Sequence, residues 1–123
     1  MRISHSRPTL GPEEEAAAAR VIASGHIAQG EVVERFERSL AGFVECRGAV
    51  ATSSGTAALH LALLALGIGQ GDEVAMPSYV CTAVLHAVRH AHARPLLADI
   101  DPATFNLDTC LLYTSPSPRD RQK

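Results

Sequence analysis

Hydrophobic and polar positions along the chain follow two repeats, one typical of helices and one typical of strands. Between residues 33 and 43, apolar side chains recur at spacings of three and four, as Val33, Phe36, Leu40 and Phe43. This spacing predicts an amphipathic helix. An alanine-rich segment at residues 13–22 follows Pro12 and opens with three glutamates. Proline and acidic side chains are both favourable in a first helical turn, so an earlier helix is expected there.

Strand-like and helix-like segments alternate in the rest of the chain. Short apolar runs predict strands at 49–51, 73–76 and 94–99, and helical patterns separate them at 57–66 and 79–90. Strands that alternate with helices of this length are typical of α/β proteins. We therefore expect an α/β fold with a mixed or mostly parallel sheet flanked by helices. The strands near Val50, Val74 and Leu97 should share that sheet, and the helix that starts at Thr56 should pack against it.

The segment between the first of these strands and the following helix is a candidate anion site. The apolar run breaks at residues 52–55, Thr-Ser-Ser-Gly, and the helical pattern restarts at Thr56. A helix that begins on Ser-Gly-Thr presents unpaired N–H groups and a hydroxyl, and its dipole favours an anion such as phosphate. Gly55 would allow a ligand to approach the backbone closely. The alternative is that Ser53 or Ser54 only caps the helix, which is the commoner role of an isolated Ser-Gly-Thr.

Four motifs in order carry a resemblance to a known family. They are Ser-Gly-Thr-Ala-Ala-Leu-His-Leu-Ala-Leu at 54–63, Gly-Ile-Gly-Gln-Gly-Asp-Glu-Val at 67–74, Pro-Ser-Tyr at 77–79 and Asp-Ile-Asp-Pro-Ala-Thr at 99–104. Together they closely resemble the pyridoxal-phosphate-dependent sugar aminotransferases of the DegT/StrS type, from about Arg20 to Asp108. The resemblance implies the aspartate-aminotransferase-like fold of type I and pyridoxal 5'-phosphate as the cofactor. It further implies a homodimer that transfers an amino group from a glutamate-like donor to a nucleotide-linked keto-sugar, as in polysaccharide biosynthesis.

The resemblance also implies which residues contact the cofactor. Ser54, Gly55, Thr56 and Ala57 correspond to the family's phosphate-binding turn. Cys81 takes the position of an aromatic residue that stacks on the cofactor ring in relatives. A thiol packs on a ring more weakly than an aromatic face, so this departure puts ring stacking in doubt. A buried and inert cysteine is the alternative interpretation of Cys81.

Family members are several times longer than this chain of 123 residues. We therefore expect residues 1–109 to be the N-terminal part of a truncated large domain. Residues 110–123, with Pro116 and Pro118, show no helix or strand period. They resemble translated sequencing-adapter sequence, and we expect a disordered, non-native tail; a flexible Ser-Pro linker is the alternative. Lys123 in this tail is the only lysine of the chain. The family's Schiff-base lysine is therefore missing, and no catalytic residue is assigned.

Composition excludes several other classes of function. A net charge of −2 and a pI near 6.3 argue against nucleic-acid binding. The sequence contains no run of about 20 apolar residues, so no membrane span is predicted. Three cysteines without a paired spacing fit the reducing cytoplasm. His86 and His90 could share a helix face, but no Glu completes a zinc motif between them, so no metal is expected. The glycines at 67, 69 and 71 follow a helix and do not match a dinucleotide fingerprint.

Two alternative functions stay open. The first is a sugar dehydratase of the same family, in which histidine replaces the lysine. The second is a non-catalytic α/β binding or regulatory module, which the missing Schiff-base lysine would support.

The lysine content generates a first prediction. Transamination needs a positioned lysine amine to hold pyridoxal phosphate covalently. Because Lys123 is adjacent to no motif, mixing the chain with pyridoxal phosphate should not produce the visible absorbance of a specific, stoichiometric lysine adduct. Such an adduct at Lys123 would contradict the truncated-domain interpretation.

Overall fold

A computed structural model describes residues 6–109 of the chain. These residues form two compact units, one that ends at Ala51 and one that begins at Thr52. The tail expected at 110–123 lies outside the described residues. Among residues 6–109, no helix is long and apolar enough to cross a membrane.

The first unit contains the two helices that the sequence predicts. Helix α1 spans Pro12–Ser24 and α2 spans Glu31–Phe43. The N–H of Gly11 donates to Oε2 of Glu14 at 2.7 Å, and this bond, with one from the N–H of Glu14 itself, lowers the pKa of the Glu14 carboxyl. The first helix ends at Gly25, whose φ of 72° lies in the left-handed region that favours glycine.

The apolar stripe of α2 is present but largely uncovered. Within the described part of this unit, Ala41 is the one buried hydrophobic residue, whereas Phe36 is 56% and Phe43 is 86% exposed. The helix therefore has the amphipathic pattern that the sequence predicts, without a partner surface over most of that stripe.

Residues 49–51 do not form the strand that the sequence predicts. They belong to no strand in the structure, and Val50 is 71% exposed. The N–H of Ala51 donates to Oε1 of Glu37 on α2 at 2.7 Å, so a side chain takes the place of a sheet partner. The expectation that this segment shares a sheet with Val74 and Leu97 is therefore wrong for this chain: an apolar run becomes a strand only where another strand satisfies its backbone.

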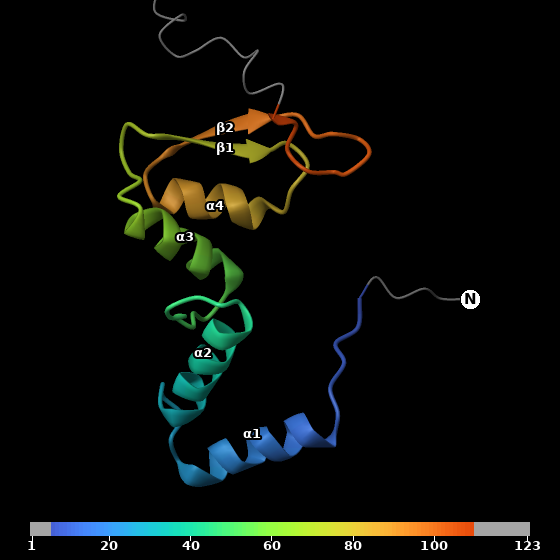
Figure 1. The fold of residues 1–123 in the computed structure, drawn as a ribbon, viewed down its shortest axis with the longest axis vertical. Helices are drawn as coiled ribbons and strands as arrows, with labels where there is room; N and C mark the ends of the chain where they lie inside the picture. Colours follow the sequence, from blue (N-terminus) through green and yellow to red (C-terminus); the bar gives the residue numbers. More distant parts are fainter. Residues whose placement is uncertain (1–5, 110–123) are drawn as a thin grey trace, which may run out of the picture. The chain divides into compact units, whose positions relative to one another are not determined.

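The second unit is built around a β-α-β arrangement. Strand β1 spans Glu73–Pro77, helix α4 spans Thr82–His90, and strand β2 spans Arg94–Ala98. The strands are parallel and in register, from the pair Glu73↔Arg94 through Val74↔Pro95 to Pro77↔Ala98. Figure 1 shows both arrows pointing the same way, with α4 along one face. This parallel α/β arrangement confirms the predicted fold class.

Small apolar side chains hold α4 against the strands. Ala87 and Val88 are 1% and 2% exposed, and Met76 of β1 is 3% exposed. The turn that follows α4 adds Ala91 and Ala93 to this core. Among residues 6–109, no polar or charged residue is buried. His92 lies within that turn at a φ of 60°.

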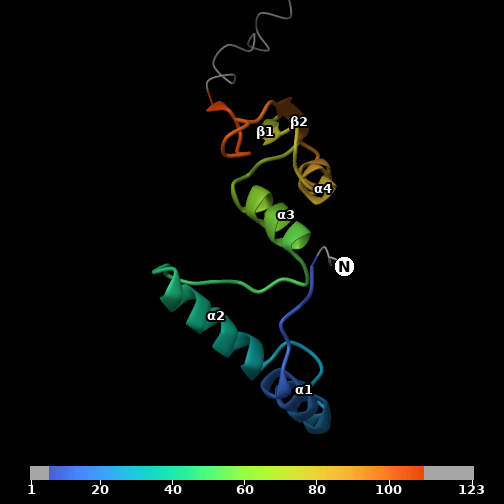
Figure 2. The same ribbon diagram turned by 90° about the vertical axis from the view of Figure 1, so that its right-hand side faces the viewer.

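Helix α3, Gly55–Ala65, packs mainly on α4 and not directly on the sheet as predicted. Figure 2 shows the two helices side by side. Helix α4 begins at Thr82, later than the predicted Tyr79. The N–H of Ser78 still donates to the carbonyl of Ala98 at 2.8 Å, so the chain leaves the sheet only after Ser78 and needs further residues to turn into the helix.

The bond between Glu37 and Ala51 generates a second prediction. A hydrogen bond to a charged acceptor contributes about 1.5–3 kcal/mol. Glu37→Ala should therefore speed hydrogen exchange at the Ala51 amide by roughly ten- to a hundredfold, as measured by NMR. The matched control is Glu34→Ala, because Glu34 is an exposed glutamate of the same helix with no bond to residue 51. Equal exchange in both variants would show that the Glu37 bond does not hold this segment.

Candidate functional site

The first turn of α3 contains four of the five residues that the sequence assigns to the cofactor. Ser54 is the N-cap, with extended backbone at φ −163° and ψ 159°. Its Oγ accepts a hydrogen bond from the N–H of Ala57 at 3.2 Å, and its carbonyl accepts one from Ala58 at 3.0 Å. Ser54 thus caps the helix, as the alternative interpretation holds. The cap uses the lone pairs of its hydroxyl and leaves the O–H proton available to a ligand.

Two backbone donors in the same turn remain free. The N–H groups of Gly55 and Thr56 precede the first intrahelical bond, and the structure records no acceptor for either among residues 6–109. The Thr56 hydroxyl also has no recorded partner there, and its side chain is half-buried. Two N–H groups and a hydroxyl at the positive end of an 11-residue helix form a set of donors suited to an anion.

The space beside Gly55 is open. A Cβ added at Gly55 would meet no heavy atom within 4 Å, and the residue has no positive φ. Neither packing within the chain nor backbone conformation therefore requires glycine at this position. A remaining reason for glycine at position 55 is that it lets a ligand approach the helical backbone closely.

Thr52 shapes the approach to this turn, a role that the sequence motif did not reveal. Its Oγ1 donates to the carbonyl of Ser54 at 3.0 Å. This bond closes residues 52–54 into a tight loop immediately ahead of the helix. A threonine two residues before a serine cap is a weak signal for such a loop, because Ser and Thr hydroxyls often bond to nearby backbone.

Cys81, the fifth assigned residue, lies on a different element. It is the N-cap of α4, its thiol is free and exposed, and no side-chain cap bond is present. Cys81 is exposed in this structure, whereas the alternative interpretation expected it to be buried. Within the described residues, no recorded hydrogen bond or ion pair joins Cys81 to the first turn of α3. Cys81 instead follows the carboxyl end of β1, the side of a parallel sheet where α/β proteins bind ligands.

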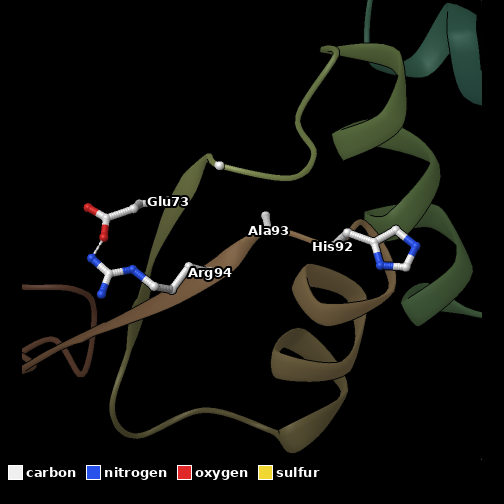
Figure 3. A pocket seen from close by; sticks show the side chains of 5 residues that line it. Glu73, His92, Ala93 and Arg94 are labelled. Atoms are coloured by element: carbon white, nitrogen blue, oxygen red, sulfur yellow. Dashed lines mark ion pairs between the residues drawn. The ribbon is translucent and has the colours of Figure 1, made fainter.

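A hollow of about 460 Å³ lies at the opposite, amino end of the strands. It is lined by Gly71, Glu73, His92, Ala93 and Arg94. Glu73 and Arg94 form an ion pair, and Figure 3 shows their side chains directed at each other while the His92 ring points away from them. Because the two charges neutralise each other and the side chains do not converge, this hollow offers no ligand-binding set.

Three histidines gather where α3 packs on α4. The rings of His60 and His90 have centroids 5.7 Å apart, and those of His86 and His90 are 6.5 Å apart. In the part of the chain that the structure describes, no three His, Cys, Asp or Glu side chains are arranged to hold a metal ion. Of these two ring contacts, the one between His60 and His90 joins α3 to α4.

Comparison with known proteins places this geometry in context. The sequence model of the DegT/DnrJ/EryC1/StrS aminotransferase family matches residues 8–114. GDP-perosamine synthase of Caulobacter vibrioides is 39% identical over 121 residues, which are 98% of this chain and 33% of that protein. The chain thus spans about a third of the length of the curated relatives it matches.

Solved structures give the same assignment. Spr1654 of Streptococcus pneumoniae, described as a sugar aminotransferase and solved in its pyridoxal phosphate form, superposes with a TM-score of 0.85 at 33% identity. That match covers 94% of this chain and 30% of the other. The E. coli GDP-4-keto-6-deoxy-D-mannose-3-dehydratase with bound hydrated pyridoxal phosphate superposes with a TM-score of 0.80 at 26% identity, over 92% of this chain and 31% of that one.

These matches confirm the family that the motifs indicated and, at the level of the family, its cofactor. The family model covers most of the chain, and the fold agrees over nearly all of it. This chain belongs to the DegT/DnrJ/EryC1/StrS aminotransferase family.

Proposed function

We propose that the first turn of α3 binds the phosphate of pyridoxal phosphate in an enzyme that transfers an amino group to a nucleotide-linked keto-sugar. The observation that carries the proposal is the set of free donors at Gly55 and Thr56. Because Gly55 has no side chain, the backbone at these donors is open to a ligand. In a family that uses this cofactor, a phosphate is the anion that such a turn suits.

Each residue of the turn has a distinct part in binding. The N–H groups of Gly55 and Thr56 and the Thr56 hydroxyl donate to phosphate oxygens, and the Ser54 hydroxyl adds a fourth donor. Ala57 keeps the cap closed through its bond to Ser54. The free, exposed thiol of Cys81 would lie against the cofactor ring, where it would take the place of an aromatic face. When bound, pyridoxal phosphate supplies an aldehyde that carries the amino group and a ring that accepts electrons.

The described residues contain no lysine, so none of them can form the covalent bond to the cofactor. Lys123 is the only lysine in the chain and lies outside them, so we assign no proton transfer to any side chain of residues 6–109. The proposed amino donor is an amino acid such as glutamate, and the enzyme is a cytoplasmic homodimer that serves polysaccharide biosynthesis. Relatives named for a GDP-linked sugar support the substrate class.

A second function within the family is supported by one comparison. The structural match to a dehydratase named for a GDP-linked keto-sugar has a TM-score of 0.80, and it supports dehydration of such a sugar as the second candidate reaction. The relatives reported above are named as enzymes, and none of them favours the alternative of a non-catalytic module.

The phosphate-binding turn can be tested on the chain itself, which gives the third prediction. Pyridoxamine 5'-phosphate cannot react with amines, so ³¹P NMR titration with this compound reports binding alone. Removing one donor to a charged group costs about 1.5–3 kcal/mol, so Thr56→Ala should weaken binding by roughly ten- to a hundredfold. Gly55→Val should abolish it, because the new side chain fills the open space beside the backbone.

Matched variants separate phosphate binding from folding. Thr82→Ala removes a threonine from the first turn of α4, and Gly42→Val changes a helical glycine that is likewise open, with nothing within 4 Å of its Cβ position. Both controls should bind as the unaltered chain does. Unchanged affinity in Thr56→Ala and Gly55→Val would show that the turn is only a helix cap.

The chain spans 33% of the length of GDP-perosamine synthase, so the fourth prediction tests activity in a chimera. Residues 8–109 of this chain replace the matching segment of the Caulobacter vibrioides GDP-perosamine synthase. The chimera should form GDP-perosamine from glutamate and the keto-sugar, and Gly55→Val in it should lower the rate at least tenfold while Gly42→Val does not. A folded, cofactor-free and inactive chimera would contradict the proposed function.

A further inference from the structure

Two exposed aromatic rings face each other at the carboxyl ends of the strands. Tyr79 follows β1 through Ser78, and Phe105 lies in the loop that follows β2, which Figure 1 shows in orange beside the arrowheads. Their ring centroids are 6.2 Å apart with planes tilted by 45°. Tyr79 is 72% and Phe105 is 62% exposed. The pair therefore buries little of either ring and leaves open aromatic surface on the side of the sheet where ligands of α/β proteins bind.

The loop that carries Phe105 is fixed by its own hydrogen bonds. The N–H of Phe105 donates to the carbonyl of Asp101 at 2.8 Å, and the N–H of Asp101 donates to Asn106 at 2.9 Å. The Asp101 carboxylate accepts from the N–H of Ala103 at 2.8 Å and from the Thr104 hydroxyl at 3.2 Å. Phe105 has a φ of 58°, which is uncommon for a bulky residue. These bonds fix the backbone of the loop at the residue that carries the exposed aromatic side chain.

Polar groups lie beside this aromatic surface. The Ser78 hydroxyl is 3.5 Å from Oδ1 of Asp99, and both residues are exposed. Oδ2 of Asp99 has no recorded donor within residues 6–109. A hydroxyl and a carboxylate can together accept and donate hydrogen bonds to the hydroxyl groups of a ligand. The two carboxylates, Asp99 and Asp101, repel phosphate groups, so the chemistry here favours a neutral ligand rather than an anion.

We propose that Tyr79 and Phe105, with Ser78 and Asp99, form a binding site for the ring of a neutral sugar. One face of a pyranose carries C–H groups that are apolar and weakly positive, and these pack on the negative face of an aromatic ring. The sugar's hydroxyl groups lie at its edge, where Ser78 and Asp99 can bond to them. The site deepens the proposed function and rests on it for its biological substrate: it holds the sugar, while the first turn of α3 holds the cofactor phosphate.

NMR of the chain with labelled aromatic side chains tests the site, with three probes. These are methyl α-D-glucopyranoside, UDP-glucose and UDP. The two probes that contain a sugar ring should shift the ring signals of Tyr79 and Phe105, and UDP should not. Phe105→Leu keeps the apolar volume but removes the aromatic face, so it should weaken UDP-glucose binding by about three- to tenfold. The control is Phe43→Leu on α2, since Phe43 is 86% exposed and should not affect binding.

Each outcome has a definite reading. The sugar site would be overturned if UDP shifted the ring signals of Tyr79 and Phe105 as much as UDP-glucose does. It would also be overturned if Phe105→Leu bound UDP-glucose with unchanged affinity. Exchange of the Ser78 and Asp101 amides, measured in each variant, shows whether the loop is still folded; Asp99→Asn, which leaves the loop's bonds around Asp101 in place, should also weaken sugar binding. If pyridoxamine phosphate binds at α3 while the sugars leave the rings unchanged, this inference fails and the proposed function stands. Ring shifts with sugar alongside an inactive chimera would support the site and contradict the proposed function.

Discussion

Helix α4 presents its smallest side chains to two parallel strands, and this contact determines where the ends of both strands lie. Ala87 and Val88 are almost completely buried beside Met76. Two parallel strands cannot be joined by a tight turn, so the helix must run back along the sheet before the second strand begins. The loops that leave β1 and β2 then emerge at one edge. Tyr79, Cys81 and the loop from Asp99 all lie at this edge for that reason.

The proposed phosphate-binding turn depends on a different constraint, which is local. A first helical turn always has donors without intrahelical acceptors. The serine cap satisfies one of them at Ala57, and a second cap residue would have satisfied more. The chain instead places Gly55 and Thr56 at the next two positions, where their N–H groups stay available. The set of free donors is thus a property of about four residues and needs little support from the rest of the fold.

This difference explains what could be predicted from the sequence. The helices at 12–24 and 31–43 and the turn at 54–57 follow from short-range spacing, and they were predicted close to their observed bounds. The strand expected at 49–51 failed because strand formation depends on a distant partner, and here Glu37 supplies the acceptor instead. The prediction that α3 packs directly on the sheet was also wrong, because such packing likewise depends on residues distant in the sequence. The contact between Tyr79 and Phe105 joins residues 26 positions apart through the parallel pairing of two strands, which no local pattern reveals.

The register of the strands also determines how the sheet can grow. The N–H of Arg94 donates toward β1 and the N–H of Ser78 donates toward β2. Because successive residues of a strand face opposite sides, the nitrogens of Pro95 and Pro77 both lie on the outer edges. Proline has no N–H to give. Pro95 interrupts the edge of β2 near its start, whereas Pro77 removes a donor only at the last residue of β1. An added strand would therefore pair more completely beside β1. The edge of β2 instead disfavours non-specific pairing with strands of other chains.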